Sequence, residues 1–142
     1  MGSELTSAVR ALAIGTRVLE RSLDDMSLAQ FRILMLVASS PERASHLADK
    51  AAVSRPSLTG LLDGLEARGW VQRVDVQGDR RGVTLELTKS GATALRHAER
   101  AMVAALESVL EFDPEARDDV LTGLEAFGAV VRKMREERLA RR

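Results

Sequence analysis

Apolar residues recur every three or four positions over much of the chain, which is the spacing of amphipathic helices. In residues 4–22 this stripe consists of Leu5, Val9, Leu12, Thr16 and Leu19. A similar stripe in residues 114–139 consists of Val120, Leu124, Phe127, Val131 and Met134. The pattern therefore predicts an amphipathic helix near each end of the chain.

Polar residues at characteristic spacings mark where further helices begin. Ser27 and Gln30 form a capping-box pair, which predicts a helix from there to about Val37. Thr88 is placed to cap a long helix through roughly residue 111. The run Asp113–Pro114–Glu115 combines a cap, a first-turn proline and an acid near the positive end of the helix dipole. It predicts the start of the last helix.

The middle of the chain contains a candidate helix-turn-helix. Ser45 can cap a short helix over His46–Ala51. After a short bend, the second helix is expected over Arg55–Arg68 and to stop at Gly69. Two helices joined by so short a turn are typical of this motif.

The segment that follows alternates between apolar and polar residues, as half-buried strands do. The residues expected to face inward are Trp70, Val74 and Val76 on one strand and Val83, Leu85 and Leu87 on the other. An arginine-rich turn, residues 77–82, joins the strands. Directly after a helix-turn-helix, this hairpin is typical of a wing. The predicted fold class is therefore mainly α with a small β-hairpin wing.

Length and composition fit a single domain over residues 1–142, with the winged part over residues 27–91. The net charge is zero, with 21 basic and 21 acidic residues, which argues mildly against a dedicated nucleic-acid binder. It leaves a winged-helix protein-interaction module as an alternative to a DNA-binding regulator. No apolar run is long enough to span a bilayer, so we expect no membrane association and a cytoplasmic location.

The sequence offers no constellation for catalysis or metal binding. There is no Cys, which excludes disulfides, thiolate metal sites and a cysteine redox sensor. His46 and His97 are the only histidines and belong to different predicted helices. No nucleophile elbow or phosphate loop is present. We therefore expect no enzyme, no catalytic residue, no metal and no cofactor.

Two segments resemble the MarR family of transcription regulators: VSRPSLTGLLDGLEARGWVQR, residues 53–73, and GDRRGVTLELTKSG, residues 78–91. The helices before and after them match that family's layout over nearly the whole chain. The resemblance implies a winged helix-turn-helix homodimer with N- and C-terminal dimerisation helices. It also implies binding to a pseudo-palindromic double-stranded DNA operator. Family members typically repress transcription, and many release DNA when a small, often phenolic or anionic, effector binds.

Within that resemblance, the helix Arg55–Arg68 is the recognition helix that enters the major groove. Small hydroxyls beside free first-turn amides suit phosphate and base contacts, and they belong to Ser54, Ser57 and Thr59. Arg55 has the fork that reads guanine, and the ring of Pro56 can touch a thymine methyl. The alternative for these first-turn residues is simple helix capping.

Gly60 is a departure from the family, because many relatives carry a longer polar residue at that place. The chain has no Asn, and its three Gln lie outside the recognition helix, so side-chain adenine readout is not expected there. Direct base readout is therefore expected to be sparse. Specificity would then depend on DNA shape sensed by the wing.

In the wing, the resemblance makes Arg81 the minor-groove arginine and Asp79 the acid that orients it. Arg80 is expected to meet phosphate. Arg73 can contact the DNA backbone or fix the wing through Asp79. A solvated charged turn is the alternative interpretation of this segment.

The helices of residues 4–22 and 114–139 are expected to form the dimer interface, with ordinary intrachain core as the alternative. The effector pocket of the family would be lined by the first, second and fifth helices. Here these helices offer Met26, Phe31, Arg10, Arg17 and Met102. The sequence identifies no particular effector.

Overall fold

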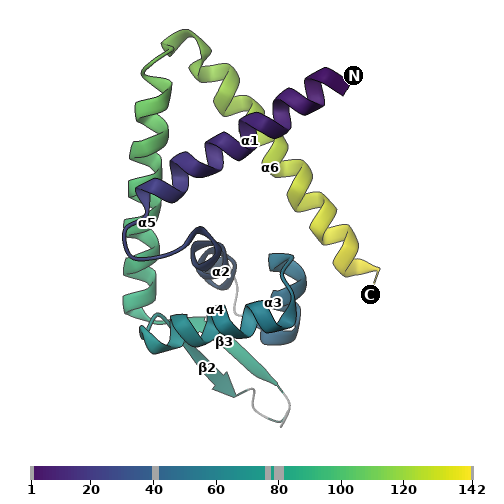
Figure 1. Cartoon of the computed structure of the whole chain (residues 1–142). Coiled ribbons are helices and arrows are strands. Elements are labelled where there is room, and N and C mark those ends of the chain that lie inside the picture. The colour runs from purple at the N-terminus through teal and green to yellow at the C-terminus, as the bar shows by residue number, and fades with distance from the viewer. Residues whose placement is uncertain (1, 40–41, 76–77, 79–81, 142) are drawn as a thin grey trace. The chain divides into compact units, whose positions relative to one another are not determined.

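The computed structural model describes residues 2–39, 42–75, 78 and 82–141. Its contacts divide the chain into two compact units, Met1–Leu106 and Glu107–Arg142. In chain order the elements are α1 (Gly2–Ser22), α2 (Leu28–Ser39), β1 (Glu42–Arg43), α3 (Ala44–Ala51), α4 (Arg55–Ala67), β2 (Val71–Asp75), β3 (Val83–Leu87), α5 (Lys89–Leu110), the 3-10 turn η1 (Pro114–Ala116) and α6 (Arg117–Ala140) (Figure 1). The predicted fold class, mainly α with a β-hairpin wing, is confirmed. In the described part of the chain, no helix has the length and apolar character of a membrane span.

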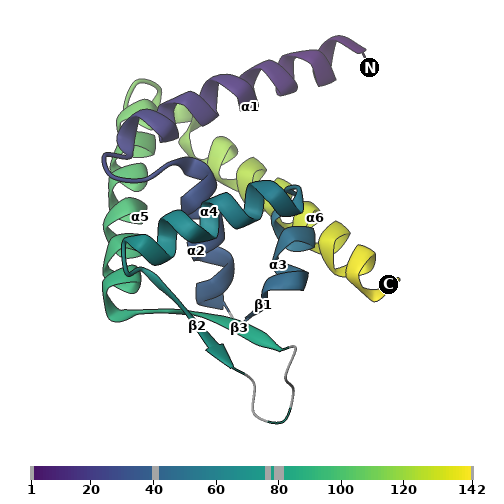
Figure 2. The ribbon, with the colours of Figure 1, turned by 60° about the horizontal axis from the view of Figure 1, so that its bottom comes forward.

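The strands form a three-stranded antiparallel sheet in the order β1-β3-β2 (Figure 2). In the hairpin, Val71 pairs with Leu87 and Asp75 with Val83. Strand β1 was not predicted from the sequence. It has only two residues, so it carries no alternating pattern, and its pairing with β3 defines it.

The core of the first unit is made by α2, α3, α4 and β3. Its largest fully buried side chains are Ile33, Leu34, Leu47, Leu65 and Leu85. On β2, the buried residue is Val71, and Val74 is 36% exposed. The prediction that Val74 faces inward is therefore wrong. Beyond its first residue, β2 leaves the core, so alternation in the sequence no longer reports burial.

Side-chain caps account for most helix starts. The capping box is confirmed: the Gln30 N–H donates to the Ser27 hydroxyl at 3.1 Å, and the Ser27 N–H donates to the Gln30 side chain at 3.0 Å. The predicted cap at Ser45 is wrong, because α3 already begins at Ala44. Its cap residue is Arg43, which has extended backbone angles and no side-chain cap bond. Instead, the pairing of β1 with β3 positions the backbone directly before the first residue of α3.

The start of α5 is fastened to the turn between α4 and β2. The Thr88 hydroxyl accepts from the Gly91 N–H at 3.0 Å and donates to the Gly69 carbonyl at 2.5 Å. The Thr88 N–H donates to the Trp70 carbonyl at 3.1 Å. A Cβ on Gly91 would lie 1.9 Å from that same carbonyl oxygen. Only glycine allows this close approach.

In the second unit, an ion pair joins the end of α5 to the start of α6. The Arg117 guanidinium donates to both carboxylate oxygens of Glu107, at 2.6 and 2.8 Å. This hydrogen bonding lowers the pKa of Glu107. Its stabilisation is present above the ordinary pKa of a glutamate and is lost as the pH falls through the lowered value. Asp113 caps the 3-10 turn η1 through the Ala116 N–H, and α6 follows directly at Arg117. The predicted cap and restart are confirmed, whereas the last α-helix begins three residues later than predicted.

Helices α1 and α6 contain no buried residue among those described. Large apolar side chains are exposed on each, with Leu5 at 68%, Val9 at 64%, Phe127 at 50% and Val130 at 67%. Each helix therefore carries large apolar side chains that remain exposed to solvent.

Replacing Gly91 with alanine should lower the free energy of unfolding by about 1–3 kcal/mol, because the new methyl meets backbone rather than a flexible side chain. The measurement is chemical denaturation at a fixed protein concentration. Gly60→Ala is the matched control: nothing lies within 4 Å of its Cβ position, so no destabilisation is expected. Equal midpoints for Gly91→Ala and the unchanged chain would contradict this account.

Candidate nucleic-acid interface

Helix α4 is buried along one face and exposed along the other. Leu58, Leu62 and Leu65 are 5%, 3% and 0% exposed and anchor the helix in the core. The predicted DNA-contacting residues of this helix and its cap are all exposed: Ser54, Arg55, Pro56, Ser57, Thr59 and Gly60. Figure 2 shows α4 above the hairpin of β2 and β3, which extends away from the helices. The buried face thus holds the first turn of α4 at the surface.

Ser54 caps α4, as the alternative interpretation of this residue expected. Its hydroxyl accepts from the Ser57 N–H at 3.3 Å and donates to the Ser57 hydroxyl at 2.9 Å. Because the two hydroxyls share one hydrogen bond, one proton of the pair remains available to an outside acceptor. Capping and presentation of a donor are therefore compatible in this turn.

Thr59 lies one turn further along. Its hydroxyl donates to the Arg55 carbonyl at 3.0 Å, so its remaining lone pairs can only accept. Pro56 occupies the first turn, where a missing N–H costs no helical hydrogen bond. The turn therefore offers one hydroxyl donor from the pair Ser54 and Ser57, an acceptor at Thr59 and the guanidinium of Arg55.

Gly60 faces open space. A Cβ at this position would have no heavy atom within 4 Å. Packing within the chain therefore does not require glycine here. A longer side chain would fit on this exposed face.

Arg73 is held against the recognition helix. Its Nε lies 2.5 Å from a Glu66 carboxylate oxygen, and its terminal nitrogen lies 3.8 Å from a carboxylate oxygen of Asp63. These contacts fix β2, the first strand of the wing, to α4. Neither acid was predicted as a partner of Arg73, although the two stand three positions apart on one helix. Asp79, Arg80 and Arg81, the other predicted wing residues, lie outside the described residues.

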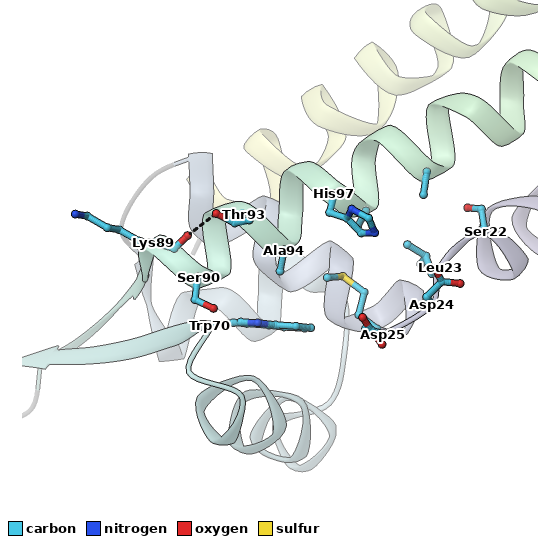
Figure 3. A pocket seen from close by; sticks show the side chains of 13 residues that line it. Ser22, Leu23, Asp24, Asp25, Trp70, Lys89, Ser90, Thr93, Ala94 and His97 are labelled. Carbon is cyan, nitrogen blue, oxygen red and sulfur yellow. Dashed lines mark hydrogen bonds between the residues drawn. The ribbon is translucent and has the colours of Figure 1, made fainter.

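A cavity of about 500 Å³ lies in the first unit, next to the opposite end of α4. It is lined by residues 22–26, by Trp70 and by the face of α5 from Lys89 to Ala101. Figure 3 shows the Trp70 ring along its edge, with His97 and Ala94 on α5. Among the pocket residues considered from the sequence, Met26 lines this cavity. The others, Arg10, Arg17, Phe31 and Met102, are not part of its wall.

Trp70 and His97 were not expected to line a pocket. Trp70 was interpreted as a packing residue, and it does pack against the core while its ring also borders the cavity. No sequence signal distinguishes the two roles, because the same large apolar ring suits both. Within the described residues, no group of three or more His, Cys, Asp or Glu is placed to hold a metal ion.

Comparison with known proteins agrees with this geometry. Residues 24–82 match the model of the MarR family. The homoprotocatechuate degradative operon repressor of Escherichia coli is 33% identical over 110 residues, covering 76% of this chain and 74% of that protein.

Two similar solved structures contain DNA. The transcriptional repressor CouR, bound to a 23-mer duplex, has a TM-score of 0.73 and 25% identity, over 86% of this chain and 89% of that chain. Sco3205 of Streptomyces coelicolor, a MarR family regulator in complex with DNA, has a TM-score of 0.70 and 26% identity, over 90% of this chain and 84% of that chain. These likenesses support a DNA-binding regulator rather than a protein-interaction module. The chain belongs to the MarR family, whose members are DNA-binding transcription regulators and not enzymes.

Proposed function

We propose that this regulator is a repressor that binds a pseudo-palindromic operator as a homodimer. The observation that carries the proposal is the first turn of α4, where exposed donor and acceptor groups stand on a helix whose other face is fully anchored. The repressor named for the homoprotocatechuate degradative operon and the repressor YetL of Bacillus subtilis, 31% identical over 97 residues, support the sign of regulation.

The side chains of this turn suit different parts of the duplex. The Arg55 guanidinium can donate twice to guanine, a contact worth about 1–3 kcal/mol of discrimination. The free hydroxyl proton of the Ser54 and Ser57 pair suits a phosphate oxygen, and the acceptor-only hydroxyl of Thr59 suits an amino group on a base edge. Ser54, Pro56 and Gly60 complete the proposed contact surface of the helix.

The wing supplies the second part of the proposed contact. Asp79, Arg80 and Arg81 are proposed to reach the minor groove and its phosphates, as the family resemblance implies. Arg73 is proposed to act by holding the wing strand, since its guanidinium already engages Glu66 and Asp63. Sequence selection would then combine sparse base contacts with groove shape.

The proposed dimer interface consists of residues 4–22 and 114–139. Neither helix has a buried residue in its own unit, although each exposes large apolar side chains. Covering such stripes with a second copy removes apolar surface from water. A symmetric dimer also presents two recognition helices to half-sites about 34–36 Å apart, one turn of DNA.

We also propose a small-molecule effector that binds in the cavity beside Trp70. The cavity volume of about 500 Å³ suits a small organic ligand. Its wall combines the Trp70 ring with polar groups of Asp25, Ser90 and His97. A regulator of transcription acts in the compartment that holds the DNA, which supports the cytoplasmic location expected from the sequence.

Arg81→Ala should weaken binding to a selected duplex at least tenfold while leaving the chain folded, because it removes the proposed minor-groove cation. Arg55→Ala should instead reduce discrimination at one base pair of each half-site. Fluorescence anisotropy with duplexes selected from random DNA measures both. Arg100→Ala, an exposed arginine on α5, removes the same charge and should leave binding unchanged. Unchanged affinity of Arg81→Ala would refute the wing assignment.

Leu12→Glu and Leu124→Glu should each produce monomers at micromolar concentration, because a buried unpaired carboxylate is costly in an interface. Analytical ultracentrifugation gives the mass. Ser7→Glu lies on α1 away from the apolar stripe and is expected to leave the dimer intact. A monomeric mass for the unchanged chain would overturn the proposed interface.

Trp70 is the only Trp and the chain has no Tyr, so its emission reports directly on the cavity. Among phenolic carboxylates, a compound that releases DNA should change this emission, and Ala94→Phe, which fills the cavity, should abolish both effects. A saturating compound should stabilise the fold by about 3 kcal/mol at a hundred times its Kd. Release that persists in Ala94→Phe would place the effector elsewhere.

A further inference from the structure

The end of the recognition helix is tied to two residues of the cavity wall by a single side chain. Arg68 directly follows α4, and its N–H donates to the Gly64 carbonyl at 3.2 Å. Its guanidinium lies over the Trp70 ring, 4.4 Å from the ring centroid. The same group donates a hydrogen bond to the backbone carbonyl of Asp25, in the loop between α1 and α2.

Both partners of Arg68 also line the cavity. Asp25 lies in the loop between α1 and α2, and Trp70 is the residue that precedes β2; both belong to the cavity wall. In Figure 3 the Trp70 ring lies along the cavity edge below Ser90 and Ala94. Arg68 therefore contacts the cavity wall from the side of α4. We name the contact of Arg68 with Trp70 and Asp25 the Arg68 clamp.

We propose that Arg68 is a positioning residue that sets the angle of α4 for DNA binding and carries the state of the cavity wall to that helix. This inference rests on the proposed function and deepens it. The clamp acts at the opposite end of α4 from the DNA-contacting turn. A movement of Asp25 or Trp70 is thereby transmitted along the recognition helix.

The geometry of a helix makes this position effective. The 13 residues of α4 form a rod about 20 Å long at 1.5 Å per residue. A tilt of about 5° at the clamped end displaces the first turn by about 2 Å, which breaks hydrogen bonds of normal length. The buried leucines resist translation of the helix, whereas the Arg68 clamp restrains the position of its C-terminal end.

The chemistry of the clamp requires arginine. A guanidinium can stack on an indole while its N–H groups donate in its own plane, which an ammonium cannot do. A carbonyl acceptor and an aromatic face also leave the positive charge of Arg68 without a carboxylate partner in this contact. The competing role for an exposed arginine here is a direct phosphate contact, and salt dependence separates the two.

The experiment measures operator affinity for Arg68→Ala, Trp70→Leu and the double variant, on the full chain at several salt concentrations. Each single variant should bind about fivefold to tenfold more weakly, because Arg68→Ala removes both the stack and the hydrogen bond to Asp25, and Trp70→Leu removes the stack. The double variant should bind no more weakly than the weaker single variant, since both changes remove one contact. Arg100→Ala is the control for charge.

Two further readouts distinguish positioning from phosphate binding. A positioning role leaves the slope of affinity against salt unchanged, whereas loss of a phosphate contact reduces it by about one. Arg68→Lys keeps the charge but not the stack, so it should bind more weakly than the unchanged chain. Arg68→Ala should also shift the emission of Trp70, the only Trp, in the absence of DNA.

Any of three results would overturn the proposed role of Arg68. They are additive losses of operator affinity in the double variant, a reduced slope of affinity against salt for Arg68→Ala, and unchanged affinity in Arg68→Lys. Denaturation midpoints identify any variant that fails to fold, and Arg68→Lys then decides the question. If the unchanged chain selects no duplex at all, the proposed function fails instead. The two failures are therefore distinguishable.

Discussion

The arrangement of this regulator depends on burial of one face of α4. Leu58, Leu62 and Leu65 are almost completely removed from water, and each such side chain contributes about 1.5–3 kcal/mol. They belong to one buried cluster with residues of α2, α3, β2, β3 and α5, so the same core that folds the first unit also orients the recognition helix. Because the first turn is exposed, its polar groups do not reduce the stability of the core.

Electrostatics in this chain are local rather than global. Equal numbers of acidic and basic residues leave no general positive field to attract DNA. Arg73 is occupied by Glu66 and Asp63 at the joint between wing and helix, and Arg68 by the aromatic ring of Trp70. Affinity for DNA must therefore arise from a few cations placed by the fold, with Arg55 and the wing tip as the proposed ones.

Local signals in the sequence were sufficient for the helices and for several of their caps, but not for the start of α3. The pair Ser27 and Gln30, and the cap at Asp113, involve neighbours three residues apart, so a single chain segment determines them. Features that depend on distant partners were missed. Strand β1 exists through pairing with β3, and the exposure of Val74 follows from where the sheet leaves the core. The cavity wall combines a loop, Trp70 and α5, which no spacing along the chain reveals.

The most direct test of the central claim is fluorescence anisotropy with the promoter region beside the protein's own gene, against random DNA, at two salt concentrations. The account predicts selective binding to the promoter that weakens steeply as salt is raised, because bound cations release counterions from the phosphates. Equal and salt-insensitive binding to both DNAs would contradict it.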